Sequence, residues 1–146
     1  MIMITEKPLV PEEFISKISG EHNGALAVFM GTVRDFVGDT RLAYMEYDAY
    51  KEMAEKKLAE IVKEAEARWK TRDIAVAHRV GRLELKEISV IVAVGTPHRA
   101  EAFEACRFII DNIKERVPIW KKEIDEQGRG EWVEGCVPSV KEPAPR

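Results

Sequence analysis

The most restrictive feature of this chain is a central run that offers no polar face to water. Ile88 to Gly95 is apolar at nearly every position, which is the pattern of a strand covered on both faces. Thr96 and Pro97 follow directly, and a threonine cap with proline in the first turn predicts a helix that continues as far as Pro118. Such a strand predicts a sheet that is sandwiched between other elements.

Strand and helix periodicities alternate along the rest of the chain. We expect a strand at Met1–Thr5, a short helix from Pro11 to Gly20, strands at Gly24–Val33 and Leu42–Tyr47, a helix at Tyr50–Trp69 capped by Asp48, a strand at 73–79, and extended segments at 119–124 and 130–133. A polar turn, 34–41, is expected to join the second and third strands as a hairpin. The last helix should bury a stripe made of Phe103, Cys106, Ile110, Ile113 and Val117.

Strand pairs interleaved with helices predict the α+β class, with a mixed or antiparallel sheet packed with helices. The 146 residues suit one domain with one core. We assign residues 1–136 to a single domain and residues 137–146, which hold three prolines, to a flexible tail.

Charge and composition exclude several classes of function. A formal net charge of −3 argues against a general nucleic-acid binder, which needs a basic surplus to displace counterions. No stretch approaches the roughly eighteen apolar residues that span a bilayer, so we expect a cytoplasmic protein with no membrane partner. Cys106 and Cys136 lack zinc-ligand spacing, and the three histidines form no recognised ligand pattern. No metal site is therefore predicted.

The start of the last predicted helix is one candidate site. Backbone N–H groups are unpaired there and carry partial positive charge, and His98 and Arg99 add two side-chain donors. The arrangement is typical of a seat for phosphate or carboxylate. A surface cap with an ordinary arginine explains the same residues, and taken alone it is the better explanation. Arg34 ends a predicted strand, and its simpler interpretation is a surface pair with Asp35 or Asp39.

Two lysines around Pro118 form another candidate site. Helical spacing places Lys114 at the edge of the buried stripe, where its stem can follow apolar surface and its amine can enter a cleft. Pro118 turns the chain, so Lys121 lies on an extended segment that can fold back towards Lys114. Two ammonium groups held close lower at least one pKa, which favours a proton donor or nucleophile near neutral pH. The alternative, a lysine-rich helix end that answers the helix dipole, is favoured by these residues alone.

Several motifs taken together resemble the molybdopterin synthase large-subunit family. The most specific is the run Lys114-Glu115-Arg116-Val117-Pro118-Ile119-Trp120-Lys121-Lys122-Glu123. Shorter matches keep the family's order: Gly31-Thr32-Val33-Arg34, Glu46-Tyr47, His78-Arg79-Val80-Gly81, Pro97-His98-Arg99 and Trp132-Val133-Glu134. The similarity runs from about Gly24 to Glu134, and it overturns the simpler interpretations of the lysines and of the helix start.

The resemblance implies an α/β-hammerhead-type fold and a dimer of large subunits, each binding one small, ubiquitin-like sulfur-carrier subunit. The carrier's C-terminal Gly-Gly thiocarboxylate would enter the large-subunit pocket and supply the sulfur that converts a cyclic pyranopterin monophosphate to molybdopterin. This chain would then need no catalytic cysteine, metal or cofactor. Lys114 and Lys121 match the essential catalytic pair. The implied substrate-binding residues, some of them reaching the site from the second large subunit, are Thr32, Val33, Arg34, His98, Arg99, Lys122 and Glu123.

Two other functions compete with the sulfurtransferase. A non-catalytic α+β dimer could hold an anionic metabolite at His98 and Arg99, and Lys114→Ala would then weaken binding without abolishing a reaction. A carrier-docking subunit could use its lysines only to meet an acidic partner, and complex formation would then depend strongly on salt, with no sulfur transfer. The enzyme interpretation predicts that Lys121→Ala reduces turnover while the complex still assembles.

Overall fold

The structure, a computed structural model, describes residues 1–133 of the chain. The predicted tail at 137–146 and Cys136 lie outside these residues, so the domain boundary stays a prediction. The elements follow the order β1 (Ile2–Thr5), α1 (Pro11–Ile18), β2 (Ala25–Thr32), β3 (Phe36–Val37), β4 (Thr40–Ala49), α2 (Lys51–Trp69), β5 (Ile74–Arg79), β6 (Gly81–Glu84), β7 (Ile88–Thr96), α3 (Arg99–Arg116), β8 (Ile119–Asp125) and β9 (Gly130–Val133).

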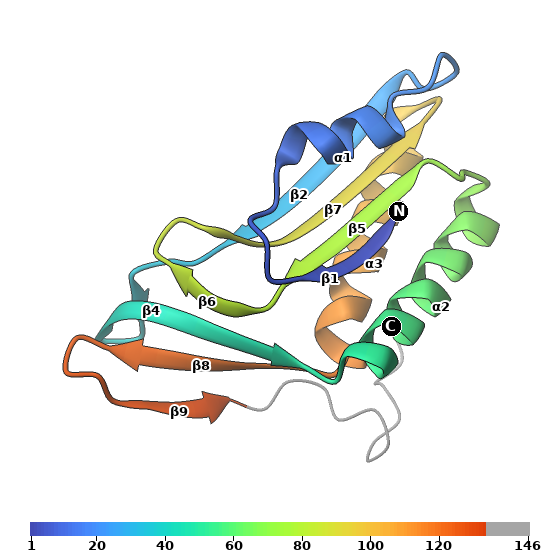
Figure 1. The fold of residues 1–146 in the computed structure, drawn as a ribbon. Coiled ribbons are helices and arrows are strands. Elements are labelled where there is room, and N and C mark those ends of the chain that lie inside the picture. The colour runs from blue at the N-terminus through green and yellow to red at the C-terminus, as the bar shows by residue number, and fades with distance from the viewer. Residues whose placement is uncertain (134–146) are drawn as a thin grey trace.

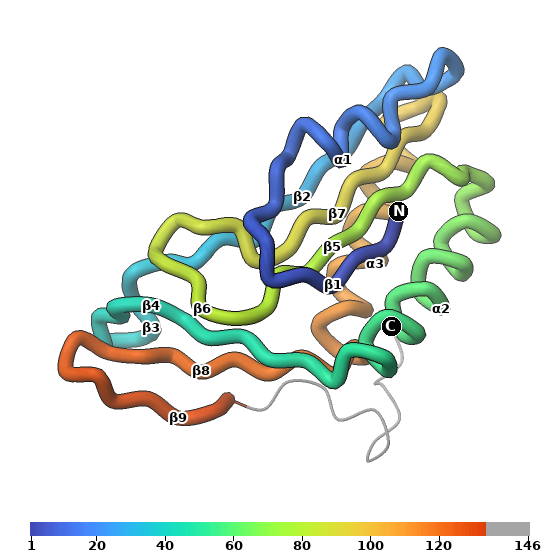
Figure 2. Tube along the Cα trace, in the orientation of Figure 1, coloured from blue at the N-terminus to red at the C-terminus, as the bar shows by residue number. Residues whose placement is uncertain are grey.

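The strands form two sheets that lie next to each other (Figure 1). The first sheet has the order β1-β5-β7-β2, with β1 parallel to β5 and the other neighbours antiparallel. The second has the order β3-β4-β8-β9, and β6 also pairs with β4. The chain passes from the first sheet to the second between β5 and β6 (Figure 2), and β6 begins at Gly81. The φ of Gly81, 92°, lies in the region that glycine adopts without a steric penalty.

The main core lies between the first sheet and the two long helices. On β5 the alternate residues Ile74 and Val76 face α2 and α3, whereas Ala75 and Ala77 face α1 on the other side. The run in β7 is buried from Ser89 to Thr96, as its unbroken apolar pattern predicted. Both faces of this sheet are therefore covered, and the predicted sandwich of sheet and helices is confirmed.

A smaller core lies under the second sheet. It consists of Val33, Leu42, Met45 and Leu83, all of them buried. Val33 is tied to the β6–β7 turn by two backbone hydrogen bonds, since its N–H donates to the Glu87 carbonyl oxygen at 3.0 Å and its own carbonyl oxygen accepts from the Lys86 N–H at 2.7 Å. These contacts fix the end of β2 against the second sheet.

The predicted hairpin between the second and third strands is wrong. β2 pairs with β7, whereas β4 pairs with β6 and β8. The polar segment between them contains β3, whose Phe36 and Val37 pair with the start of β4. Strands that are consecutive in sequence need not pair when a more apolar partner is offered elsewhere. Here β7 provides that partner for β2.

The buried face of α3 also differs from the predicted stripe. Cys106, Ile113 and Val117 are buried as expected, but Phe103 is 68% exposed. The sheet is instead met by Ile109 and by two alanines, Ala102 and Ala105, because small side chains let the helix approach closely.

Both predicted helix caps are wrong in detail. Thr96 belongs to β7, and α3 begins only at Arg99, after His98, which makes no side-chain cap hydrogen bond. The α2 cap position is Tyr50, which also makes none. The Asp48 carboxylate accepts a hydrogen bond from the Ala49 N–H instead. In each case the expected capping residue belongs to the preceding strand, since β7 ends at Thr96 and β4 runs one residue beyond Asp48.

Candidate active site

Lys114 and Lys121 line one pocket, where the last turn of α3 meets β8. Pro118 ends the helix, and the chain reverses tightly around it, with the Ile119 N–H donating to the Val117 carbonyl oxygen at 2.8 Å. This turn leads into β8, which carries Lys121 back beside the helix end. The convergence of the two amines on one hollow is therefore as the sequence predicted.

The pocket has a volume of about 160 Å³ and lies at the seam between the two sheets. Its apolar walls are Ile113, Val117 and Ile119. Its remaining lining residues are Tyr47 and His78. Tyr47 comes from β4, where it lies directly opposite Lys121 in the antiparallel pair.

The electrostatics of the pocket lower the pKa of Lys114. Burial of the ammonium lowers the pKa of Lys114 below its ordinary value, and the positive charge of Lys121 lowers it further. The residue as a whole is exposed, which fits a stem at the rim with its amine turned into partly desolvated surroundings. Lys114 is therefore the group in this pocket that most readily gains nucleophilic character.

His78 lines the same pocket and is buried. It is only 3% exposed, and burial lowers its pKa to about 4, opposed by a hydrogen bond to the Arg79 carbonyl oxygen and aided by the charge of Lys114. Tyr47 meets its ring edge-on, with ring centroids 5.1 Å apart. Burial raises the pKa of Tyr47 above the ordinary value, a hydrogen bond with Ser89 opposes this, and the charge of Glu123 adds to it.

The other predicted site residues near β2 lie outside this pocket. Thr32 and Arg34 are exposed at the end of β2. The Val33 side chain is 2% exposed and belongs to the core of the second sheet. Within one chain, therefore, Thr32–Arg34 lies beside the seam but does not line the hollow that holds the two amines.

His98 and Arg99 are exposed at the opposite end of α3 from Lys114. Fifteen residues separate Arg99 from Lys114, which corresponds to about 22 Å along a helix axis. One subunit therefore does not bring the predicted anion seat to the amine pair.

Lys122 and Glu123, the two residues after Lys121, lie in different surroundings. The Lys122 ammonium lies 5.8 Å from the centroid of the Trp132 ring. Glu123 shares with Lys121 the side of β8 that faces Tyr47, because alternate residues of a strand point the same way. One of its carboxylate oxygens, Oε2, is buried without a hydrogen-bond partner among the described residues.

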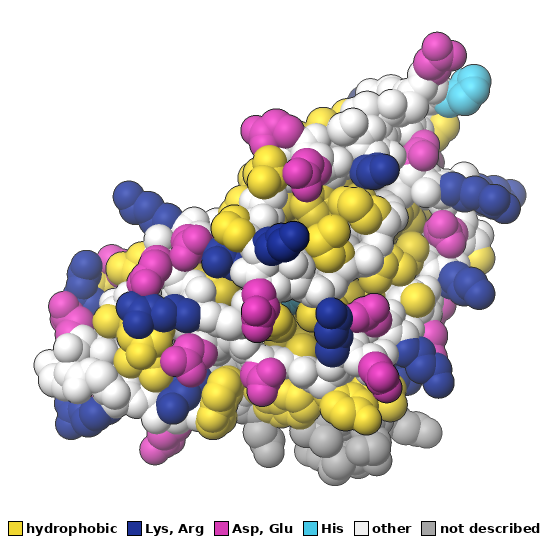
Figure 3. All heavy atoms as spheres, viewed as in Figure 1, with side chains coloured by type: hydrophobic (Ala, Val, Ile, Leu, Met, Phe, Trp, Pro, Cys, Tyr) yellow, Lys and Arg dark blue, Asp and Glu magenta, His cyan; other side chains and the backbone are white. Residues whose placement is uncertain are grey.

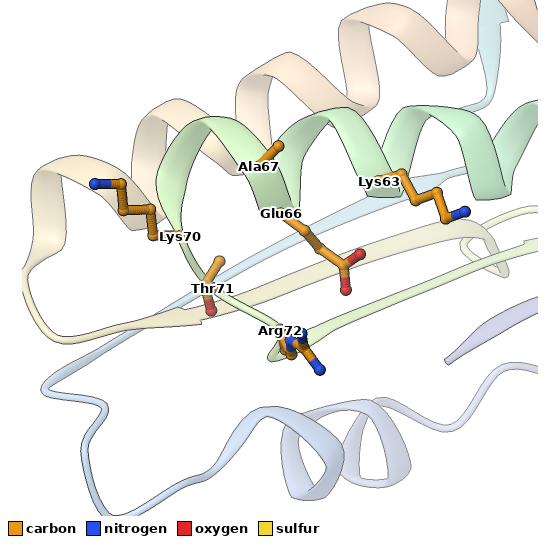
Figure 4. Close-up of a pocket in the computed structure, with 6 residues that line it drawn as sticks. All are labelled: Lys63, Glu66, Ala67, Lys70, Thr71 and Arg72. Carbon is orange, nitrogen blue, oxygen red and sulfur yellow. The ribbon is translucent and has the colours of Figure 1, made fainter.

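A larger hollow of about 470 Å³ lies elsewhere, at the end of α2, and Figure 4 shows its lining. The amines of Lys63 and Lys70 extend in opposite directions there (Figure 4), so they do not converge on one ligand. The face of the molecule drawn in Figure 3 carries basic and acidic side chains interspersed rather than a field of one sign. Neither feature competes with the lysine pocket as a site for an anion.

The sequence interpretation did not assign Tyr47 or His78 to the site. Both lie within motifs that carried the family resemblance, Glu46-Tyr47 and His78-Arg79-Val80-Gly81, so a signal was present. His78 lacked the spacing of a metal ligand, and the described residues contain no group of three side chains able to hold a metal ion. Its position in the pocket depends on pairing between distant strands, which local spacing does not reveal.

The arrangement is suited to chemistry on a small anionic acyl group. Two amines can bind a negative charge, and a lysine whose pKa is lowered, as that of Lys114 is, can stabilise or attack an acyl carbon. Cys106, the one cysteine among residues 1–133, is buried in α3, and burial raises its pKa to about 11. It is a core residue, as predicted, and the pocket holds no thiol.

Fold and pocket together define an α+β protein whose two sheets meet at a small, amine-lined pocket. Residues 4–116 match the family described as MoaE protein. The chain belongs to this family.

Individual relatives agree with the family match. The molybdopterin synthase catalytic subunit of Halalkalibacterium halodurans is 48% identical over 125 residues, which cover 86% of this chain and 80% of the relative. The X-ray structure of molybdopterin synthase from Staphylococcus aureus matches with a TM-score of 0.85 and 42% identity, over 89% of this chain and 94% of that one. This match confirms the α+β, hammerhead-type fold.

A further structural match concerns an assembly. It is a complex of subunits 1 and 2 of molybdopterin-converting factor from Helicobacter pylori, with a TM-score of 0.73 over 90% of this chain and 89% of that one. Its sequence identity is 20%, so the likeness is one of fold.

Proposed function

We propose that this chain is the catalytic subunit of a molybdopterin synthase, a sulfurtransferase that converts cyclic pyranopterin monophosphate to molybdopterin. The observation that carries the proposal is the placement of Lys114 and Lys121 in one small pocket without a thiol. The sulfur then arrives on the C-terminal thiocarboxylate of a small ubiquitin-like carrier subunit. The H. pylori complex of two subunits and the relatives named catalytic subunits support such a partner.

The size of the pocket supports entry of the carrier's tail. A hollow of about 160 Å³ is smaller than the roughly 300–1,000 Å³ typical of sites that enclose a drug-sized ligand. It accommodates the end of a Gly-Gly tail, which has no side chains. The pyranopterin must then lie largely outside this hollow and present its reacting carbons at the mouth.

The two lysines take different roles in this proposal. Lys114, with its lowered pKa, lies beside the acyl carbon, stabilises charge as sulfur leaves, and can be acylated by the carrier's terminus. Lys121 holds the substrate or donates a proton as the pterin side-chain carbons are substituted. No metal or cofactor takes part in either step.

The anion seat requires a second copy of the chain. β2 is an edge strand of the first sheet, and its side chains Leu26, Phe29 and Met30 are exposed. Two copies paired antiparallel along β2 would bury this apolar edge. They would also carry the start of α3 of one copy towards the Thr32–Arg34 end of the other, because Ala25 of β2 pairs with Thr96 just before that helix.

In this homodimer Arg34 and the second copy's His98 and Arg99 bind the cyclic phosphate and the pterin. Thr32, Val33, Lys122 and Glu123 complete the substrate-binding region, Val33 through its backbone because its side chain is buried. We place the enzyme in the cytoplasm. No helix among residues 1–133 is long and apolar enough to cross a membrane.

A reconstituted assay tests this function. Thiocarboxylated carrier and cyclic pyranopterin monophosphate are mixed with the native chain, Lys114→Ala, Lys121→Ala or Lys63→Ala, and product is followed by mass spectrometry. Lys63 is a matched control, since it is an exposed lysine on α2 away from the pocket. We expect product from the native chain and from Lys63→Ala, and a large loss in the two pocket variants with the carrier complex still formed.

The competing functions make different predictions in the same assay. A metabolite-binding module forms no product with any of the four proteins. A carrier-docking subunit loses the complex itself, in a strongly salt-dependent way, when a pocket lysine is removed. Either result would replace the sulfurtransferase proposal.

A further inference from the structure

His78 occupies a position in the pocket that the two lysines do not explain. On β5 it continues the row of Ile74 and Val76 that faces the long helices, and it lies opposite Val90 of β7. The last turn of α3 lies over this row, with Ile113 lining the same pocket. A residue at this position is expected to be apolar, so a buried imidazole here needs a reason.

The hydrogen bonding of His78 fixes which ring nitrogen faces a ligand. Nδ1 lies 2.8 Å from the Arg79 carbonyl oxygen, and a carbonyl oxygen only accepts, so Nδ1 carries the proton. Since the ring is neutral near pH 7, Nε2 presents a lone pair. His78 is 3% exposed and lines the cavity, and no described residue makes a hydrogen bond to Nε2. Nε2 is not among the fully buried atoms that lack a partner, so it is open to the cavity, where a donor on a ligand can take the place of water.

The pocket is therefore complementary to a ligand that carries both a hydrogen-bond acceptor and a hydrogen-bond donor. Its two amines require an acceptor, best an anion, whereas Nε2 of His78 requires a donor. A glycyl thiocarboxylate has both, because its amide N–H is separated from the acyl carbon by a single CH₂ group. The lone pair of Nε2 repels the anionic end, so that end turns to the amines and the N–H turns to His78.

We propose that Nε2 of His78 accepts a hydrogen bond from the amide N–H of the last residue of the carrier's tail and so sets the direction in which the tail enters. This contact rests on the proposed function, and it makes His78 a specificity-determining residue for the tail. It selects a terminal peptide bond with a free N–H, and the two lysines select the acid that follows it. A proline-like or ester-linked terminus lacks the donor and is discriminated against.

The test removes the N–H without touching the enzyme. A carrier is prepared by semisynthesis with the last peptide bond replaced by an ester, as a thiocarboxylate for single-turnover sulfur transfer and as an inert carboxylate for calorimetric binding. The natural amide carrier is the control. With the native chain we expect the ester to lower transfer efficiency and affinity by roughly 3- to 10-fold, the range of one neutral hydrogen bond.

Two variants complete a double-mutant cycle. In His78→Asn the side-chain amide can still donate to the Arg79 carbonyl oxygen but has no group at the position of Nε2. In His78→Gln an amide oxygen can reach that position. We expect the ester to cost less than about twofold in His78→Asn, and the amide carrier to be used better by His78→Gln than by His78→Asn.

Each outcome decides one point. An ester carrier that the native chain binds and uses as well as the amide carrier overturns the contact, and this comparison stands even if the variants fold poorly. An ester penalty of the same size in His78→Asn as in the native chain also overturns it. If the native chain forms no product with the amide carrier, the proposed function itself fails. If the native chain forms product and uses the ester carrier at the same rate as the amide carrier, only the role of His78 is refuted.

Discussion

Acidification should destabilise this protein through a single buried side chain, His78. In the folded state its pKa is about 4, chiefly because it is buried, whereas an unfolded chain has an ordinary histidine pKa of about 6.5. Between pH 6.5 and pH 4 this histidine is therefore protonated in the unfolded chain but not in the folded protein. The stability contributed by neutral His78 is therefore complete above about pH 6.5 and is lost as the pH falls towards 4.

The magnitude follows from the two pKa values. Their difference corresponds to about 3 kcal/mol, with a steepest slope of about 1.4 kcal/mol per pH unit. That is a large fraction of the roughly 5–15 kcal/mol by which domains are stable. Carboxylates titrate in the same range, so the native protein alone does not isolate the effect.

Urea unfolding of the native chain and of His78→Gln at matched pH separates the contributions. Glutamine does not titrate, and both proteins share the same carboxylates. We expect the native chain to lose about 3 kcal/mol more than the variant between pH 7 and pH 4, at one fixed protein concentration. Two stability curves that run parallel over this range would show that His78 is not held neutral by the fold.

Three further predictions follow from the described contacts. Lys121→Ala removes the positive charge that lowers the pKa of Lys114, so acylation of the Lys114 amine by a small reagent, followed by mass spectrometry, should require a higher pH. An unchanged profile would mean that the amines do not interact. Ile109→Ala should cost about 2–5 kcal/mol of unfolding free energy, because Ile109 is fully buried. Phe103→Ala on the same helix should change it by less than about 0.5 kcal/mol, and equal losses would contradict the observed face of α3. Cys106, whose pKa is raised to about 11, should react with iodoacetamide at pH 8 only after denaturation, with the labelled cysteine identified by peptide mass spectrometry because the chain also contains Cys136. Rapid labelling of Cys106 itself in the folded protein would contradict its burial.

Much of the fold could be predicted from the sequence because the patterns that indicate its elements are local. The unbroken apolar run of β7 and the three-and-four spacing of α2 depend on residues near each other in sequence. The amine pair is local too, since Lys114 and Lys121 are joined by one proline turn. Position within a periodic segment, a stop and a turn indicated that the two amines could converge, and the family resemblance decided in favour of this interpretation.

The errors concern long-range pairing and the choice of a helix face. β2 pairs with β7 across more than fifty residues of sequence, and nothing in the segment between β2 and β4 signals this. The stripe on α3 was assigned by size, yet the sheet accepts Ala102 and leaves Phe103 in solvent. His78 joins the pocket only through such non-local pairing, which explains why its part in the site emerged from the structure.

The proline turn has a consequence for transplanting this chemistry. The two amines lie within one short segment, residues 113–121. The imidazole of His78 and the phenol of Tyr47, which line the same pocket, belong to other strands of the protein. A chimera that receives only residues 113–121 would contain both lysines, but their pKa values would depend on the residues of the new protein. Exchanging this segment between distant proteins would thus vary the environment of the amines while their spacing along the chain stays constant.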